Sequence, residues 1–172
     1  VDAAVGVVTN GIELEREYDR TADELPIGEA LGVYGMMLVG NRELVDEAPE
    51  AIESLLRAIA RGWIDATNDP EAAIDALVAR NATLERRRGI EEAKFRAAAE
   101  GLQYTDHVAE AGWGVHRDER WKRLAALLSE TELLEGAVDP DRAWTNEYID
   151  RDAPPIREYA ARIGRVPGES TT

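Results

Sequence analysis

The spacing of apolar residues changes near residue 45, and this change constrains the fold more than any other feature of the sequence. Ahead of it, residues 2–9, 25–27 and 32–40 form short apolar runs, and the first of these is β-branched like a strand buried on both faces. Beyond it, apolar residues recur at steps of three and four, the spacing of an amphipathic helix. We therefore predict an α/β chain with three short strands and a helix over 12–18 at its front, and a mostly helical remainder after residue 45.

The helical remainder carries recognisable start signals. Asp46 is a candidate N-cap for its first helix, because acidic residues follow it near the positive end of the helix dipole. Asp69-Pro70 and Asp139-Pro140 each place a capping carboxylate before a proline at the first helical position. We expect further helices over 84–102, 118–128 and 156–163, and disorder after Gly164.

The composition is strongly acidic, with a formal net charge of -15 at pH 7. This charge disfavours nucleic acid and anionic membrane surfaces as partners. The absence of cysteine excludes disulfides, thiolate metal sites and cysteine nucleophiles, and no apolar run is long enough to span a membrane. Of the 20 basic residues only Lys94 and Lys122 are lysines. An acidic, lysine-poor chain is typical of adaptation to high salt, and an arginine-biased genome is the alternative explanation.

The strand count of the front is too small for a self-sufficient sheet. Strands buried on both faces need neighbouring strands to complete their hydrogen bonds. The first run begins inside a strand pattern without a preceding turn or cap. We therefore expect partner strands upstream, so that this chain is the C-terminal part of something larger.

The common catalytic templates do not fit this sequence. It contains neither G-x-S-x-G nor a phosphate-binding glycine loop, and its only histidines are His107 and His116. Either histidine is a candidate base or ligand contact, although we favour a local structural role for both. Trp113 lies between two glycines and is a candidate binding residue, whereas Trp63, Trp121 and Trp144 fall on apolar stripes and are expected in the core. We interpret Arg86-Arg87-Arg88 as a salt-bridged face, because glutamates flank it.

Polar residues follow the first predicted strand. Thr9 and Asn10 come at its carboxyl end, and Glu13 lies one turn into the helix that follows. Ligands of open α/β sheets bind at this edge, because side chains and helix N–H groups converge there. Thr9 offers a hydroxyl, Asn10 a donor and an acceptor, and Glu13 a charge for an amine or amidine-like group. A simple turn and helix cap is the alternative interpretation of the same residues.

The order of motifs is similar to that of ABC-transporter substrate-binding proteins of the NMT1/THI5-like group, which includes thiamine-pyrimidine, nitrate, sulfonate and taurine binders. The resemblance is carried by V-D-A-A-V-G, T-N-G-I-E and Y-G-M-M-L-V in the front, and then by a longer central stretch. In that stretch Ala48-Pro49-Glu50, Gly62-Trp63 and Asn68-Asp69-Pro70-Glu71 match the group's P-E…G-W…N-P-E pattern, with Asp69 as an extra residue. Later segments resemble the group's closing motifs, so the resemblance covers roughly residues 1–150.

The resemblance implies part of a two-lobed, type II periplasmic-binding-protein-like fold that closes on its ligand. Residues 1–33 would end the second lobe, 34–150 would supply a crossover strand and helices that pack on the first lobe, and 151–172 would be a partly disordered extension. It implies an extracytoplasmic protein that binds a small polar molecule without a cofactor or catalysis, works with an ABC permease, and needs an upstream portion or second chain. Thr9, Asn10, Glu13 and Tyr34 are the ligand contacts that we expect on this basis.

Ligand identity and two other classes of function stay open at this point. A thiamine-precursor pyrimidine is the favoured ligand, and a sulfonate or nitrate-like anion comes next. A pyrimidine-biosynthesis enzyme on the same fold is an alternative, although the Cys-rich motif of the related fungal enzyme is missing from this chain. A helical module that holds a partner through its apolar stripes is the other alternative.

Overall fold

The structure is a computed structural model that describes residues 5–7, 9–21, 23–99, 106–131, 133, 136 and 138–150. Helices account for the regular structure of this part of the chain. The α-helices are α1 (Thr9–Tyr18), α2 (Ile27–Leu31), α3 (Arg42–Glu47), α4 (Pro49–Asn68), α5 (Pro70–Arg80), α6 (Arg88–Ala98), α7 (Asp106–Ala111) and α8 (Asp118–Glu130). Two 3₁₀ helices cover Ala82–Arg87 and Pro140–Arg142.

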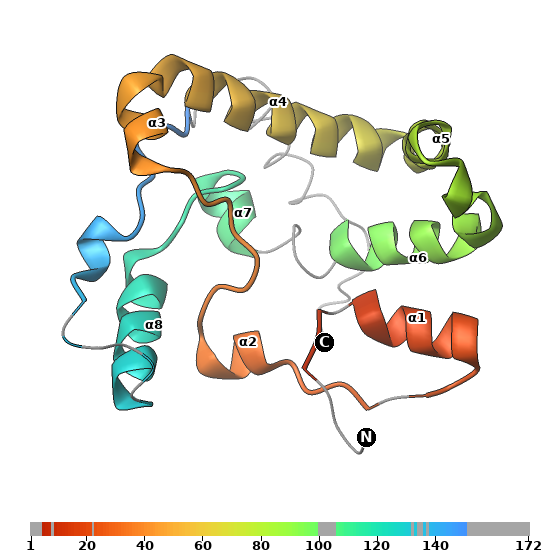
Figure 1. Cartoon of the computed structure of the whole chain (residues 1–172), viewed down its shortest axis with the longest axis horizontal. Helices are drawn as coiled ribbons and strands as arrows, with labels where there is room; N and C mark the ends of the chain where they lie inside the picture. Colours follow the sequence, from red (N-terminus) through yellow and green to blue (C-terminus); the bar gives the residue numbers. More distant parts are fainter. Residues whose placement is uncertain are drawn as a thin grey trace.

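The long helix α4 organises the arrangement (Figure 1). At one end of α4 the chain turns into α5 and then α6, which runs back beneath α4, and α1 packs against α6 from the other side. At the other end lie α3 and, below it, α8, which packs against the 3₁₀ turn at Pro140–Arg142. Helices α1, α5 and α6 thus lie toward one end of α4, and α3 and α8 lie toward the other. The first group contains the predicted ligand contacts Thr9, Asn10 and Glu13.

The junction between α4 and α5 forms as the local sequence predicts. Asp69 ends α4, and its carboxylate accepts a hydrogen bond from the N–H of Ala72 at 3.0 Å, while Pro70 occupies the first position of α5. The Asp69 carboxylate thus satisfies one of the N–H groups at the helix start that have no partner within the helix. Proline is tolerated at Pro70, because an N–H at this first position would have no acceptor in the helix. The predicted cap at Asp69 is therefore confirmed.

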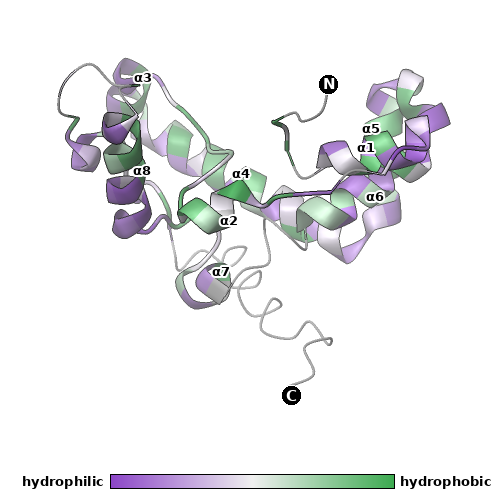
Figure 2. Ribbon diagram, turned by 90° about the horizontal axis from the view of Figure 1, so that it is seen from below, coloured by the Kyte–Doolittle hydropathy of each residue, from purple (hydrophilic) through white to green (hydrophobic). Residues whose placement is uncertain are grey.

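The core of the described part is small. Its buried apolar residues are Ala60, Ile64, Ile74, Ala99 and Val115. Trp113 and Ile149 pack against Ala60, so two segments distant in the sequence contact α4 at the same point. Trp63 of α4 stacks on Phe95 of α6, with ring centroids 5.8 Å apart. Figure 2 shows apolar stretches on α4 and a largely hydrophilic α8.

The three predicted strands are not found among the described residues. Segment 32–40 has no regular structure, and its side chains Met36 and Val39 are 82% and 88% exposed. Ile27 begins α2 instead of ending a strand, and Thr9 begins α1, while 1–4 and 8 lie outside the described residues. Strand patterns depend on a neighbouring strand for their hydrogen bonds, and the described part supplies none.

The helical prediction after residue 45 is confirmed, with shifts at its boundaries. Asp46 is not an N-cap, because Asn41 caps α3 by accepting from the N–H of Glu43 at 2.9 Å. The helix then breaks at Ala48, since Pro49 disfavours helical geometry in the preceding residue and restarts the chain as α4.

The remaining helices agree in part with the sequence pattern. The segment predicted over 84–102 begins as a 3₁₀ turn before α6, and 100–102 lie outside the described residues. The helix expected over 118–128 is α8, and Asp139 caps the turn at Pro140 as expected. The predicted helix over 156–163 and the disordered tail also fall outside the described residues.

Candidate functional site

Thr9 and Asn10 lie at the first turn of α1, not at the end of a strand. The side-chain oxygen of Asn10 accepts from the N–H of Val7 at 2.8 Å, and the Asn10 N–H donates to the Val7 carbonyl at 2.8 Å. Asn10 also reaches Glu13, with Nδ2 3.4 Å from Oε2. Asn10 therefore fixes the path by which the chain enters α1, as the turn-and-cap interpretation expects.

Glu13 is the centre of an ion cluster that joins α1 to α6 and to the 3₁₀ turn that precedes α6. Its Oε1 lies 2.6 Å from Nη2 of Arg87 and 3.0 Å from Nζ of Lys94. Glu17 adds a contact of 3.1 Å to Arg87, and Glu91 lies 3.5 Å from Lys94. Hydrogen bonds from Lys94 and then Arg87 lower the pKa of Glu13, so its carboxylate stays charged in the folded chain. We call these five residues the α1–α6 clamp.

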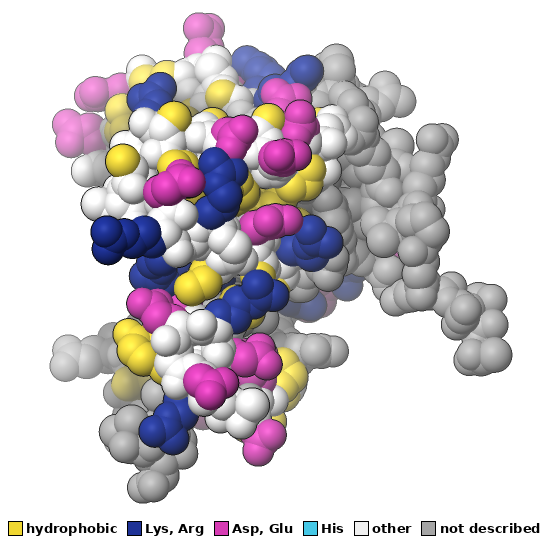
Figure 3. Space-filling model, turned by 90° about the vertical axis from the view of Figure 1, so that its right-hand side faces the viewer, with side chains coloured by type: hydrophobic (Ala, Val, Ile, Leu, Met, Phe, Trp, Pro, Cys, Tyr) yellow, Lys and Arg dark blue, Asp and Glu magenta, His cyan; other side chains and the backbone are white. Residues whose placement is uncertain are grey.

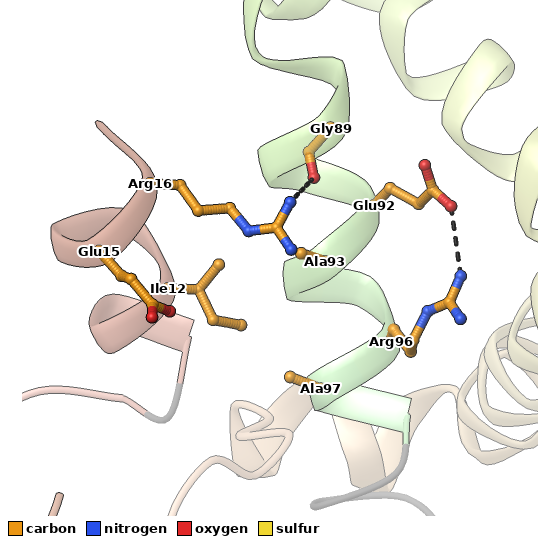
Figure 4. A pocket seen from close by; sticks show the side chains of 8 residues that line it. All are labelled: Ile12, Glu15, Arg16, Gly89, Glu92, Ala93, Arg96 and Ala97. Atoms are coloured by element: carbon orange, nitrogen blue, oxygen red, sulfur yellow. Dashed lines mark hydrogen bonds and ion pairs between the residues drawn. The ribbon is translucent and has the colours of Figure 1, made fainter. Parts of the chain in front are cut away.

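A groove lies on the other side of the same helix pair (Figure 4). Its volume is about 510 Å³, within the range of small-molecule sites, and it is open to solvent. Arg16 crosses from α1 to the Gly89 carbonyl at 3.4 Å, and Glu92 and Arg96 pair at 3.3 Å on α6. The residues that line it are Ile12, Glu15, Arg16, Gly89, Glu92, Ala93, Arg96 and Ala97. The lining thus combines acidic and basic side chains with the apolar side chains Ile12, Ala93 and Ala97.

Acidic and basic side chains alternate over the end of the molecule that contains these helices (Figure 3). Arg88 lies 2.6 Å from Asp75 and 3.9 Å from Glu85, while Arg87 belongs to the clamp. The prediction that the arginine triplet forms a salt-bridged face is therefore confirmed for Arg87 and Arg88.

Tyr34 lies in a different cluster, beside α8. Its hydroxyl oxygen accepts from the N–H of Arg117 at 2.6 Å, and the guanidinium of Arg120 lies 5.3 Å from its ring centroid. Figure 1 shows α1 and α8 on opposite sides of the molecule. The structure thus brings Thr9, Asn10 and Glu13 together on α1 and places Tyr34 away from them.

The cluster around Tyr34 is built from aromatic rings. His116 lies 4.6 Å from Tyr34, 5.6 Å from Trp121 and 6.1 Å from Trp144, measured between ring centroids. The planes of Trp121 and Trp144 differ by only 3°. Gly114, with φ of +79°, provides the left-handed turn that leads the chain into this cluster. Trp121 and Trp144 are partly buried in this cluster and do not belong to the buried core, where their apolar stripes predicted them. Trp113 packs against Ala60.

Sequence reasoning did not find the clamp or the groove. Arg87 and Lys94 follow Glu13 by 74 and 81 residues, so no local pattern connects them. The helical spacing of Arg87, Glu91 and Lys94 does place their charges on one face, and this was the available signal. Within the described ranges, no group of three or more histidine, aspartate or glutamate side chains is arranged to hold a metal ion.

Comparison with known proteins gives one family match. Residues 1–73 match the family described as NMT1/THI5 like. No curated protein and no solved structure matches the chain. The family has a type II periplasmic-binding-protein fold, and the mostly helical structure after residue 45 is consistent with part of such a fold. The matched residues include α1, Tyr34 and all of α4.

Proposed function

We propose that this protein is the solute-binding component of an ABC importer and binds a small polar organic molecule. The observation that carries the proposal is the match of residues 1–73 to the NMT1/THI5-like family, whose members are consistent with solute binding. The match contains the P-E…G-W…N-D-P-E stretch and the polar start of α1.

The charge of Glu13 favours a ligand with a cationic or amidine-like edge. Glu13 is charged, and Lys94 and Arg87 already contact it, so a ligand group that replaces one of these cations gains the same partner. A thiamine-precursor pyrimidine carries such an edge and is our first choice, with a sulfonate or nitrate-like anion next. Thr9 and Asn10 lie on the same end of α1 and are the proposed neighbouring contacts.

Tyr34 contributes to the same ligand only if the chain between α1 and Tyr34 moves. In solute-binding proteins of two lobes, closure brings together residues that are apart in the open form. Closure also excludes water from the polar contacts, which strengthens them. We infer that Tyr34 joins the site in this way.

The setting that we propose is extracytoplasmic, with a permease and an upstream lobe or second chain as partners. The low lysine content supports a saline environment for this acidic chain. None of the described helices has the length and apolar character of a membrane span.

The test is isothermal titration calorimetry of the full chain at an ionic strength of about 1 M, which screens its net charge. The probes are the aminopyrimidine precursor of thiamine, taurine and nitrate. We expect saturable binding of the pyrimidine, and no saturable binding with any probe would reject the proposed function.

Two variants separate a ligand contact from a structural role. Glu13→Gln and Arg87→Gln each break the clamp, but only the first alters the proposed contact. We expect Glu13→Gln to weaken binding at least tenfold and Arg87→Gln to leave affinity within about threefold, which corresponds to differences above and below about 1 kcal/mol. Equal losses in both variants would refute the assignment of Glu13 while leaving the function standing.

A helical interaction module is the second candidate, and one observation favours it. Segment 36–39 exposes Met36, Leu38 and Val39, each more than half accessible, without a described covering element. The enzyme alternative finds less support, because His107 and His116 contact Arg117 and Trp121 near α8 rather than the groove.

A further inference from the structure

The α1–α6 clamp contains one carboxylate more than it contains cations. Its carboxylates belong to Glu13, Glu17 and Glu91, and its cations to Arg87 and Lys94. These side chains are only 14–35% exposed, so water and salt screen the unbalanced negative charge in part. A cationic group that reaches the clamp therefore improves its charge balance, whereas an anion makes the balance worse.

Arg87 is the more firmly held of the two cations. Its Nη2 lies 2.6 Å from Glu13 and 3.1 Å from Glu17. Its Nε lies 3.8 Å from Glu91 and is buried, without a hydrogen bond in the described part of the chain. A planar guanidinium has its donors in a fixed arrangement, so Arg87 cannot leave one carboxylate without disturbing its contacts to the others.

Lys94 has a second partner within reach on its own helix. Its Nζ lies 3.0 Å from Oε1 of Glu13 and 3.5 Å from Glu91. Glu91 precedes Lys94 by one turn of α6, so the two side chains are neighbours on the helix surface. The ammonium group has three donors on a flexible stem, and it can turn toward Glu91 without movement of the backbone. Lys94 thus keeps an ion pair when it leaves Glu13.

The identity of this residue stands out against the composition of the chain. Of the 20 basic residues only Lys94 and Lys122 are lysines. An arginine in place of Lys94 would also neutralise Glu13, but it would hold the carboxylate with two parallel hydrogen bonds and release it less easily. A lysine at this position suits a contact that is made and broken.

We propose that Lys94 is the exchangeable cation of the clamp, and that an ammonium or amidinium group of the ligand takes its place on Glu13. Lys94 then passes to Glu91, and Arg87 stays in contact with Glu13. This inference rests on the proposed function and assigns the charge of its ligand. The exchange selects cationic ligands over sulfonates and nitrate, and an aminopyrimidine enters this class when its ring nitrogen takes up a proton from solvent.

The test is calorimetric titration of the full chain with the aminopyrimidine precursor of thiamine, and the key variant is Lys94→Arg. This variant keeps the charge and replaces the ammonium by a guanidinium that holds Glu13 more firmly. We expect it to weaken binding about threefold or more. The matched control is Lys122→Arg, which makes the same change beside Asp118 on α8 and should leave the affinity unchanged. Equal affinity in the two variants would overturn the exchange.

Removal of the competing cation gives the opposite expectation. Lys94→Gln frees Glu13 from one partner and should tighten binding, whereas Lys122→Gln removes the same charge far from the clamp and should not. A simple change of local charge would also tighten binding in Lys94→Gln, but it would leave Lys94→Arg equal to the unmodified chain. The exchange requires both effects together, and the absence of either would overturn it.

A measurement on the unmodified protein covers the case in which Lys94→Arg does not fold. Isotope-labelled lysine gives side-chain nitrogen signals from Lys94 and Lys122 alone, because the chain has no other lysine. At saturation with the pyrimidine we expect the Lys94 signal to shift and the Lys122 signal to stay in place. A Lys94 signal that does not shift would overturn the exchange.

Failure of the exchange and failure of the proposed function give different results. Saturable binding of taurine or nitrate without binding of the pyrimidine would leave the solute-binding function standing and overturn the exchange. Absence of saturable binding with all three probes would reject the function, and the exchange with it.

Discussion

Ile64 is the side chain on which the described core depends most directly. It is 1% exposed and is the largest fully buried side chain of the described residues. Truncating a buried isoleucine to alanine typically costs about 2–5 kcal/mol, from lost burial and the remaining cavity. The core around it is small and open, so its neighbours can partly collapse into the space. We therefore expect Ile64→Ala to lower the free energy of unfolding by about 3 kcal/mol.

The matched control is Leu55→Ala on the same helix. Leu55 is 53% exposed, so its truncation should change the free energy of unfolding by less than about 1 kcal/mol. Both variants are measured by urea denaturation followed at the helical circular-dichroism band, with the slope required to stay constant. If the two variants lose equal stability, α4 does not bury the face assigned to it here, and the reasoning about the core fails.

Three further predictions concern single contacts. Asp69→Ala should lower the free energy of unfolding by about 1 kcal/mol in the same denaturation assay, because it removes the cap on Ala72, whereas Asp69→Asn keeps an accepting side-chain oxygen and should avoid most of that loss. The pKa of Glu13 is lowered in the fold, so its contribution to stability is complete above the ordinary carboxylate value and is lost as the pH falls through the lowered value; melting temperatures from about pH 6 to about pH 3 should fall less steeply in Glu13→Gln. The pKa of His116 is also lowered, so the neutral ring stabilises the fold at neutral pH and this stability declines as the pH drops below about 6.5; His116→Gln should flatten the pH dependence of the melting temperature in that range.

The parts of the fold that were predictable are those that local sequence determines. Asp69-Pro70 combines a cap and a proline that act on adjacent residues, so its role follows without knowledge of the rest of the chain. The apolar stripe of α8 is likewise contained within one helix. The prediction of Asp46 as an N-cap was wrong, because Asn41 caps the earlier helix α3, which contains Asp46, and Pro49 then begins α4.

The strands and the site depend on partners far away in the sequence. A run such as 32–40 becomes a strand only when another strand pairs with it, and the described residues contain no such partner. Glu13 was identified as a charged residue at the start of a helix, but its partners Arg87 and Lys94 come from the 3₁₀ turn at Ala82–Arg87 and from α6. Local sequence patterns could not reveal which cations contact Glu13, or that the Tyr34 hydroxyl accepts a hydrogen bond from the N–H of Arg117.

The most direct test of the account is whether the protein binds a small polar solute through the start of α1. Calorimetric titration of the full chain with the aminopyrimidine precursor of thiamine, at an ionic strength of about 1 M, gives the answer in one experiment. We expect a saturable isotherm that weakens at least tenfold in Glu13→Gln and much less in Arg87→Gln. An absence of saturable heat with the pyrimidine, taurine and nitrate alike would contradict it.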